Sequence, residues 1–284
     1  MAIFTNQATL SYNNTVTNSN IATGELLEVL SATKTAVMNG YVQNDNISYI
    51  ISITNTGTTA FTNLSISDNL GAYSFGTGLL YPLTYTPDSV RYYINGVLQP
   101  VPAVTETQPL VITGINVPAA GNAIIVYETR ANQYAPLGVN DSITNEAIIT
   151  EEGLSTPVTV SETVSTEDRA ELTITKAITP ATVTENGQIT YTFIIQNSGN
   201  TAADAGDNVF ITDTFAPILS SLTVEFNGTA WTKETNYTYD ETTGVFSTVQ
   251  GQITVPAATY QRDPDNGNWI INPGVSILTV TGTI

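Results

Sequence analysis

The sequence predicts an all-β protein built from two tandem β-sandwiches, and three observations support this fold class. Thr, Val, Ile and Tyr, which are favoured in strands, are abundant in the 284-residue chain, whereas Lys and Arg are sparse. Segments of alternating apolar and polar residues recur along the chain and are separated by short turns rich in Gly, Pro and Asn. One segment recurs half a chain length later, which divides the chain into two similar units.

The repeat is marked by two lysines, Lys34 and Lys176, which lie half a chain length apart. They precede the matching segments Gln43–Gly57 (QNDNISYIISITNTG) and Glu185–Gly199 (ENGQITYTFIIQNSG). Because the period equals half of the chain, copies of the chain laid end to end would continue it without a break.

Alternation in the first repeat predicts short strands joined by turns. The expected strands are Asn46–Asn55, Leu64–Asp68, Ser89–Ile94, Leu110–Val117, Ala123–Thr129, Ile143–Thr150 and Val158–Val164. Asn95-Gly96 and its counterpart Asn227-Gly228 indicate hairpin turns, and one helical turn is expected near 218–222. About seven short strands per repeat are typical of an immunoglobulin-like sandwich.

The two ends of the chain carry complementary parts of one repeat. The first repeat continues into Ile143–Ile149 (ITNEAII), and the second repeat has no such strand. A matching sequence is found at the N-terminus, in Phe4–Leu10 (FTNQATL). We therefore expect an N-terminal donor strand or arm at 1–25, a first sandwich at 26–165 and a second sandwich at 166–284 that lacks its final strand.

A sandwich without its final strand exposes backbone hydrogen-bonding groups and apolar core to water. The simplest remedy is that residues 1–25 of one molecule complete the second sandwich of another, with Phe4, Ala8 and Leu10 entering its core. Such a head-to-tail contact propagates as an open filament unless it closes into a ring. Two alternatives remain: the arm folds back onto its own second sandwich, or the arm is disordered.

Composition excludes several function classes. The absence of Cys excludes disulfides and thiolate metal sites, and the absence of His excludes Ser-His-Asp nucleophile systems and imidazole metal centres. A formal net charge of −18 argues against nucleic acid and anionic membranes as partners. The acidic segment Asp263–Asn268 lacks the third ligand and the distal Glu of a calcium loop, so we expect a turn there. We expect no enzyme, cofactor or metal site.

The chain shows no targeting signal. Its start lacks the positive region and apolar core of a secretory signal, and no stretch approaches the ~18 apolar residues of a membrane span. No C-terminal sorting motif is present. We expect either that an export signal was removed, or that assembly begins in a cytoplasm and the product is released by lysis, as for an appendage on a spore.

The repeated motif resembles a known family, the bacterial and archaeal conserved-repeat domain catalogued as domain of unknown function eleven, which occurs in tandem in surface proteins. The match is carried by a Lys, a Tyr, an Asn-x-Gly, a strand Asp and a final Asn-x-Ala. In the first repeat these are Lys34, Tyr49, Asn55, Gly57, Asp68, Asn145 and Ala147. In the second they are Lys176, Tyr191, Asn197, Gly199 and Asp213, with Asn6 and Ala8 supplied from the N-terminus. The resemblance implies a structural, surface-exposed role.

The same residues also resemble the isopeptide-bonded domains of Gram-positive pilins and adhesins. There a buried Lys amine attacks an Asn carboxamide, ammonia leaves, and a nearby carboxyl group moves the protons. Burial lowers the pKa of the amine and raises that of the acid, and a rigid core holds the groups together. The candidates are Lys34, Asn145 and Asp68 within the first sandwich, and Lys176, Asn6 and Asp213 between subunits.

Two other interpretations of these residues stay open. In the first, both lysines are solvated and the asparagines cap turns. In the second, each Lys forms a buried ion pair with its Asp without a covalent bond. The sequence as a whole favours a structural subunit of an extracellular or spore-surface fibre whose partner is the chain itself. The competing function class is a monomeric adhesin or stalk module that binds a glycan or protein ligand. The sequence does not identify a separate tip or anchor protein.

Overall fold

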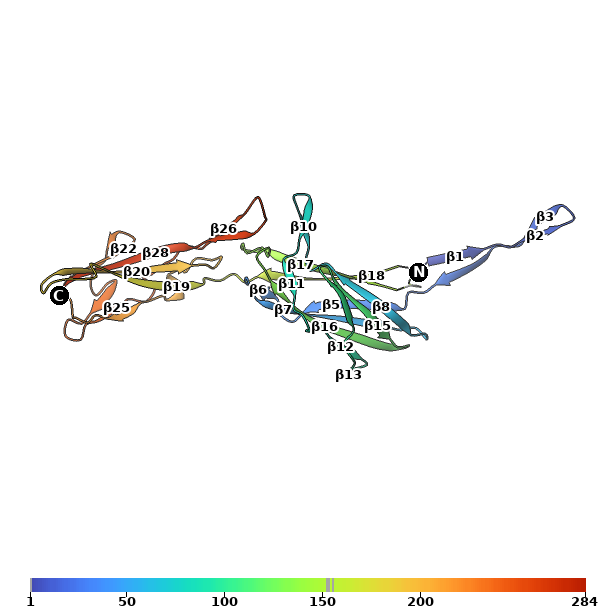
Figure 1. Cartoon of the computed structure of the whole chain (residues 1–284), viewed down its shortest axis with the longest axis horizontal. Coiled ribbons are helices and arrows are strands. Elements are labelled where there is room, and N and C mark those ends of the chain that lie inside the picture. Colours follow the sequence, from blue (N-terminus) through green and yellow to red (C-terminus); the bar gives the residue numbers. More distant parts are fainter. Residues whose placement is uncertain (1, 152–153, 155) are drawn as a thin grey trace.

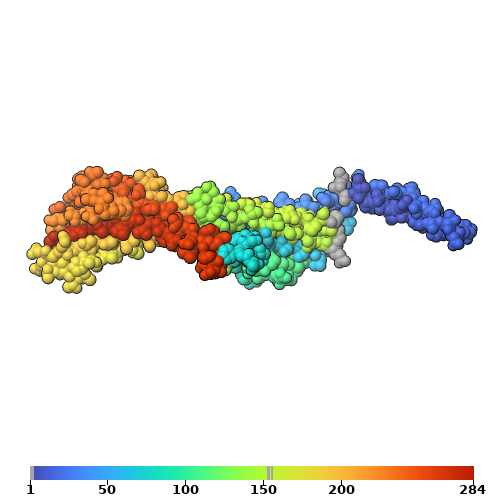
Figure 2. All heavy atoms as spheres, turned by 90° about the horizontal axis from the view of Figure 1, so that it is seen from above, coloured from blue at the N-terminus to red at the C-terminus, as the bar shows by residue number. Residues whose placement is uncertain are grey.

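The structure, a computed structural model, describes residues 2–151, 154 and 156–284 and is elongated and almost entirely β (Figure 1). Two sandwiches lie in a row, and a narrow arm projects from the first sandwich away from the second (Figures 1 and 2). The described residues contain one helical element, the 3-10 turn η1 at Ala205–Asp207. The helical turn expected near 218–222 is wrong, because Ser220–Phe226 forms a strand whose inward side chains enter the core. The all-β fold class is confirmed.

The first sandwich consists of two six-stranded sheets. One sheet has the order β13-β12-β16-β7-β5, with β11 also paired to β16; its strands are β5 (Leu30–Ala36), β7 (Asn46–Asn55), β11 (Leu83–Tyr85), β12 (Arg91–Ile94), β13 (Val97–Leu98) and β16 (Gly121–Ala131). The other has the order β14-β15-β8-β17-β18-β6; its strands are β6 (Gly40–Tyr41), β8 (Phe61–Asp68), β14 (Ala103–Thr107), β15 (Leu110–Val117), β17 (Ser142–Thr150) and β18 (Val158–Thr166).

The second sandwich repeats this plan with fewer strands. Its larger sheet has the order β19-β20-β28-β22-β23, from β19 (Leu172–Thr179), β20 (Gln188–Asn197), β22 (Ser220–Phe226), β23 (Thr229–Ala230) and β28 (Gly274–Thr283). Its smaller sheet has only three strands, in the order β21-β25-β24, from β21 (Thr212–Thr214), β24 (Tyr237–Tyr239) and β25 (Val245–Thr248). Among the described residues, this sheet has no counterpart of β17 or β18.

Strand register shows that the two sandwiches correspond residue by residue. Asn55 pairs with Gly121 across β7 and β16, and Asn197 pairs with Gly274 across β20 and β28. Each of these asparagines is buried and accepts a hydrogen bond at 2.9 Å from the backbone N–H of the glycine two residues later. The repeated Asn-x-Gly therefore closes the same turn in both sandwiches.

The N-terminal arm is a two-stranded ribbon, whereas the sequence led us to expect a single strand. β1 (Ala2–Asn6) pairs with β4 (Ala22–Leu26), and β2 (Thr9–Tyr12) pairs with β3 (Thr15–Asn18). The ribbon reverses at Asn13 and Asn14, whose φ angles of 47° and 62° fit the left-handed turn conformation that Asn tolerates. In this structure the arm points away from the second sandwich of its own chain (Figure 1).

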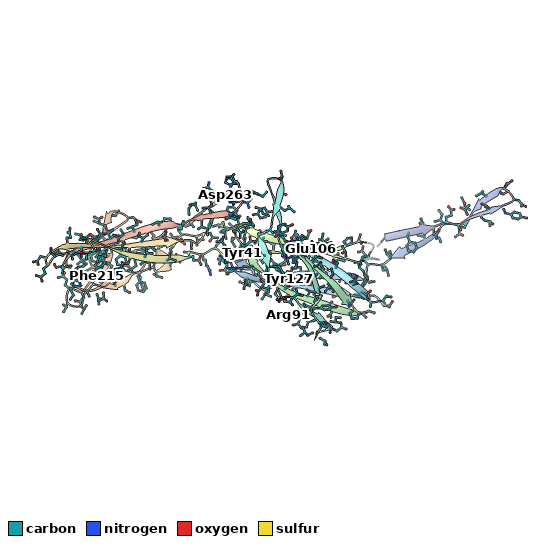
Figure 3. All side chains as sticks on the ribbon, in the orientation of Figure 1. Tyr41, Arg91, Glu106, Tyr127, Phe215 and Asp263 are labelled. Atoms are coloured by element: carbon teal, nitrogen blue, oxygen red, sulfur yellow. The ribbon has the colours of Figure 1, made fainter. Side chains whose placement is uncertain are left out.

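Two further hairpins extend beyond the sandwiches. β9 (Tyr73–Phe75) pairs with β10 (Gly78–Leu80) in the first sandwich, and β26 (Thr259–Arg262) pairs with β27 (Trp269–Asn272) in the second. Each sandwich has its own apolar core, of which Tyr127 and Phe215 are central members (Figure 3). Among the described residues no helix has the length and apolarity to cross a membrane.

Candidate functional site: two lysine–aspartate sites and an open sheet edge

The first site is a buried ion pair that joins the two sheets of the first sandwich. Lys34 on β5 places its Nζ 2.6 Å from Oδ2 of Asp68 on β8, and both side chains have no exposed surface. The other carboxylate oxygen, Oδ1, accepts a hydrogen bond at 2.9 Å from the backbone N–H of Leu70. The carboxylate is therefore fixed in position, and its Oδ2 is directed at the amine. Burial lowers the pKa of Lys34, and Asp68 partly opposes this effect.

Two tyrosines complete the surroundings of this ion pair. The Tyr127 hydroxyl on β16 donates a hydrogen bond to Oδ2 of Asp68, and the Lys34 Nζ lies 4.9 Å from the centroid of the Tyr49 ring. The Tyr49 and Tyr127 rings stack with centroids 5.7 Å apart. Burial, and then the Asp68 carboxylate, raise the pKa of Tyr127 well above its usual range, so its hydroxyl stays protonated as a donor. Sequence reasoning missed the contribution of Tyr127.

Asn145 supplies the third predicted group of the first site. It lies on β17 two residues before Ala147, which is directly opposite Asp68, so both side chains are on the inner face. Asn145 is fully buried, and neither its amide nitrogen nor its amide oxygen has a hydrogen-bond partner among the described residues. A buried polar group without a partner costs about 1–3 kcal/mol. The amide partly offsets the rise in the pKa of both Tyr49 and Tyr127.

The second site has the same lysine and aspartate but is open to solvent. Lys176 on β19 contacts Oδ2 of Asp213 on β21, with side-chain exposures of 39% and 18%. The Lys176 Nζ lies 4.4 Å from the Tyr191 ring centroid, as Lys34 lies over Tyr49. No asparagine of the second sandwich stands in the place of Asn145, because the strand that would carry it has no counterpart there.

One aromatic position differs between the two sites. Register places Tyr127 opposite Tyr49 and Val280 opposite Tyr191, so a valine replaces the tyrosine in the second sandwich. The space is filled by Phe215, whose ring stacks on Tyr191 with centroids 4.9 Å apart (Figure 3). The second aspartate therefore lacks the hydroxyl donor of the first.

The second sandwich has an open edge beside this site. In the first sandwich β8 pairs with β15 on one side and with β17 on the other. Its counterpart β21 pairs only with β25 among the described residues. Strand β19 is exposed along its whole length, whereas Leu30 and Lys34 on its counterpart β5 are buried, because β18 packs on β5. The place that β17 and β18 take in the first sandwich is thus unfilled in the second, and Ile174 and Ile178 of β19 are exposed there. We call this open edge between β19 and β21 the groove.

The arm presents the sequence that this groove lacks. Phe4, Asn6, Ala8 and Leu10 match Ile143, Asn145, Ala147 and Ile149 in the alignment. Those four residues of β17 are buried, while the four residues of the arm are exposed, Phe4 to 60% and Leu10 to 64%. Of the predicted site residues, Lys34, Asp68 and Asn145 lie in one site of the first sandwich, and Lys176 lies beside Asp213 in the second. Asn6, Phe4, Ala8 and Leu10 lie on the arm, at the opposite end of the molecule (Figure 1).

No family model and no curated protein matches the chain, so the resemblance to the conserved-repeat family remains a prediction. Among solved structures, the chain is similar to the RrgB pilus backbone of Streptococcus pneumoniae, with 12% identity over 86% of this chain and 55% of that one and a TM-score of 0.36. It is also similar to a C-terminal fragment of the major pilin GBS80 of Streptococcus agalactiae, with 14% identity, 87% and 91% coverage and a TM-score of 0.34. A family 123 glycoside hydrolase from Clostridium perfringens is similar at 12% identity over 49% of this chain and a TM-score of 0.31, and the chain spans 27% of its length. These likenesses are too distant to assign a function.

Proposed function

We propose that this chain is the structural subunit of a fibre in which the N-terminal arm of one copy fills the open groove of the second sandwich of the next copy. The observation that carries the proposal is geometric. The ribbon β17–β18 extends from the second sandwich into the first, and the arm extends from the first sandwich in the same direction, where the second sandwich of another copy would lie (Figure 1). Repeating this relation adds one copy after another in a row.

The side chains that would meet in this contact complement each other in size. In the first sandwich the inner face of β5 carries the small Ala32 and Ala36, and β18 covers it with Val158, Val160 and Val164. The second sandwich reverses the sizes: β19 carries Ile174 and Ile178, exposed to 52% and 42%. Pairing in β1–β4 and β17–β18 places Gly24 and Ala22 of the arm where β18 has Val164 and Glu162. Large side chains on one partner therefore meet small ones on the other, which conserves the packed volume.

Burial and charge both favour this contact. Each large apolar side chain that becomes fully buried contributes about 1.5–3 kcal/mol, and the arm offers Phe4 and Leu10 on the face that matches β17. Among residues 2–26 the single charged side chain is Glu25, although the whole chain has a formal charge of −18. The arm can therefore approach an acidic partner with little repulsion.

The contacts of the first site also support a covalent bond within the first sandwich. In the proposed reaction the neutral Lys34 amine attacks Cγ of Asn145, a C–N amide bond forms, the C–NH₂ bond breaks and ammonia leaves. Asp68 accepts a proton from the amine and delivers it to the departing NH₂ group, so no other reactant is required. The Tyr127 hydroxyl holds this carboxyl group in place. The product removes a buried lysine charge and uses the unpartnered amide of Asn145.

The same reaction between Lys176 of one copy and Asn6 of the next would join subunits covalently. In the free subunit the Lys176 amine is partly solvated, so the arm must first cover the site and exclude water. Each bond lowers the mass by one ammonia. Mass spectrometry of boiled, digested fibres should find the Lys176–Asn6 linkage, and Asn6→Ala should abolish it while filaments still form. Unlinked peptides from wild-type fibres would overturn the covalent step and leave arm donation standing.

Arm donation is tested with a chain that lacks residues 2–26 and a synthetic peptide of those residues. We expect the shortened chain to remain monomeric in size-exclusion chromatography with light scattering, and to bind the peptide in a one-to-one complex. A peptide in which Phe4, Ala8 and Leu10 are replaced by Ser is the matched control and should not bind. Failure of the native peptide to bind would contradict the proposed function. We place such a fibre at the outer surface of a cell or spore.

A further inference from the structure

The two sandwiches of one chain are joined by more than a linker. The β26–β27 hairpin of the second sandwich lies against the β9–β10 hairpin of the first, and the two lie side by side in both views of the molecule (Figures 1 and 2). The backbone N–H of Trp269 on β27 donates a hydrogen bond at 3.0 Å to the carbonyl oxygen of Gln133 in the first sandwich. We call this contact between the two hairpins the clasp.

Arg262 is at the centre of the clasp. Its guanidinium carbon lies 4.7 Å from the Tyr73 ring centroid and 5.6 Å from that of Phe75, both on the first sandwich. The ring centroid of Trp269, which is paired with Arg262 across β26 and β27, is 4.8 Å away. The Tyr73 hydroxyl in turn donates a hydrogen bond at 2.7 Å to the carbonyl oxygen of Tyr134. A cation within cation–π distance of three aromatic rings from two sandwiches is a specific contact, and not an incidental one between surfaces.

The tip of the β26–β27 hairpin packs closely on the other hairpin. Gly267 has a φ of +76°, and a Cβ placed on it would overlap the Leu80 side chain and lie 3.2 Å from the Phe75 ring. The acidic segment predicted as a turn forms this tip, where the Asp263 side chain accepts a hydrogen bond from the backbone N–H of Asp265 at 2.9 Å. The tight turn at 263–268, with a glycine at position 267, therefore allows the two hairpins to pack closely.

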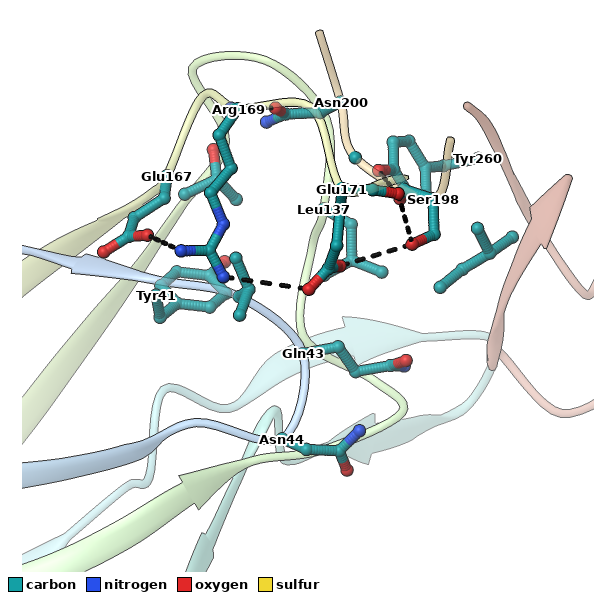
Figure 4. A pocket seen from close by; sticks show the side chains of 14 residues that line it. Tyr41, Gln43, Asn44, Leu137, Glu167, Arg169, Glu171, Ser198, Asn200 and Tyr260 are labelled. Atoms are coloured by element: carbon teal, nitrogen blue, oxygen red, sulfur yellow. Dashed lines mark hydrogen bonds and ion pairs between the residues drawn. The ribbon is translucent and has the colours of Figure 1, made fainter. Parts of the chain in front are cut away.

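The linker beside the clasp, residues 167–171 between β18 and β19, is also held in place. Arg169 lies between the two sandwiches and forms ion pairs with Glu167 at 3.0 Å and Glu171 at 3.8 Å (Figure 4). Its backbone N–H donates a hydrogen bond at 3.0 Å to the side chain of Asn200. These residues line a cavity of about 310 Å³ between the linker and the two sandwiches. Two of the seven basic residues of the chain, Arg169 and Arg262, are thus used at this joint.

Neither half of the clasp is repeated in the other sandwich. The matched segments Ile115–Ala120 and Ile253–Ala258 are followed by the matched glycines Gly121 and Gly274, so β26–β27 is an insertion in the second sandwich alone. The segment between β8 and β11 carries β9–β10, while the corresponding segment between β21 and β22 has no strand. Asn200, whose side chain accepts the hydrogen bond from the linker, is also not repeated: the matching position in the first sandwich, near the base of the arm, is Thr58.

From these contacts we infer that the clasp fixes the two sandwiches of one chain as a single rigid rod, and that the joint between successive copies lacks it. The rigid rod is a property of the single chain, whereas the alternation of stiff and compliant joints along a fibre rests on the proposed function. In the fibre a stiff joint within each subunit alternates with a compliant joint between subunits. Bending under load would then concentrate at every second joint.

The rod is tested on the single chain by single-molecule energy transfer between dyes on cysteines that replace the exposed Glu106 and Thr238 in the two sandwiches. The chain has no natural Cys, so both labels are unique. The labelled chain also carries Phe4→Ser, Ala8→Ser and Leu10→Ser, the substitutions that block arm donation, so that it stays monomeric. We expect a narrow distribution, a distinctly broader one for Arg262→Ala and for Trp269→Ala, and no change for Arg91→Ala, which lies away from the clasp. An equally broad distribution without any clasp substitution, or no broadening in either clasp variant, would overturn the rod.

The alternation is tested by measuring joint angles in micrographs of fibres. We expect a narrow and a broad angle distribution at successive joints, and two broad ones in fibres of Arg262→Ala. Equal distributions at all wild-type joints would overturn the alternation while the fibre itself stands. If no fibre forms, the proposed function fails, and the energy-transfer measurement still decides whether the rod exists.

Discussion

Ala147 lies directly opposite Asp68 in the antiparallel pairing of β17 with β8, and the next pair, Ile148 with Ser67, directs its side chains away from the core. This register fixes how the Asn two residues before Ala147 reaches the buried lysine. If the arm fills the second sandwich in the same way, every contact between two copies follows from it.

The register predicts that Thr9 of one copy lies opposite Thr212 of the next. A variant carrying Thr9→Cys and Thr212→Cys should form disulfide-linked multimers on mild oxidation, visible as a ladder in non-reducing denaturing electrophoresis. The experiment is done with Asn6→Ala, so that no isopeptide bond adds to the ladder. The matched control, Thr9→Cys with Thr214→Cys, is shifted by two residues on the same face of the strand and should link poorly. Equal linking in both variants would contradict the register.

Gly24 should be a determinant of the fit between the arm and the second sandwich. It pairs with Phe4, and a Cβ at Gly24 would overlap the Phe4 ring. Overpacking typically costs about 1–3 kcal/mol, so Gly24→Val should weaken binding of the arm peptide to the arm-deleted chain by about 5- to 150-fold. Thr23→Val, on the other face of the ribbon, is the control. Calorimetry would contradict the size complementarity if both peptides bound equally well.

The two aspartates should differ in their effect on stability. Asp68→Ala prevents the proposed Lys34–Asn145 bond and leaves Lys34 buried without its partner, and the unpaired buried charge alone costs about 3–5 kcal/mol. Partly exposed pairs such as Lys176 with Asp213 contribute about 0–1 kcal/mol. Both Trp residues are in the second sandwich, so Trp fluorescence follows its unfolding and calorimetry follows both sandwiches. We expect Asp68→Ala to lower only the transition without a Trp signal. A comparable loss in Asp213→Ala would show that the second site is not open.

The buried tyrosines predict a loss of stability at high pH. Burial raises the pKa of Tyr49 and Tyr127 in the folded protein, so above pH ~10 the unfolded chain has released protons that the folded chain retains. The stability that these groups contribute is therefore present below pH ~10 and is lost as the pH rises further. At pH 11, phenolate absorbance should be equal in wild type and Tyr127→Phe when folded, and should differ by one tyrosine when unfolded. A difference in the folded state would show that Tyr127 is accessible.

The alternation of apolar and polar residues, together with the turn residues, made most strands of the first sandwich predictable, because one face of each strand is buried and the other is exposed to solvent. The second half of the arm was not predictable. Its strand β4 carries Ala22 and Gly24 where β18 has Glu162 and Val164, so the pattern that marks β18 is missing. The small residues are explained only by the large side chains on β19 that they would cover.

The lysines, aspartates and asparagine of the sites were predictable because they recur at matched positions. Tyr127 was not, since a tyrosine in an alternating strand is common; the available signal was its replacement by Val280 in an otherwise matched strand. The clasp was also missed. Its hairpins are insertions with weak alternation, and only the fold brings Arg262 to Tyr73.

Electron microscopy of the purified chain, with and without its arm, tests the central claim most directly. The account predicts unbranched filaments, one subunit wide, that lengthen with concentration and are shortened by adding the arm-deleted chain, which accepts an arm but donates none. Single particles with free arms at every concentration, unchanged by the arm-deleted chain, would contradict it.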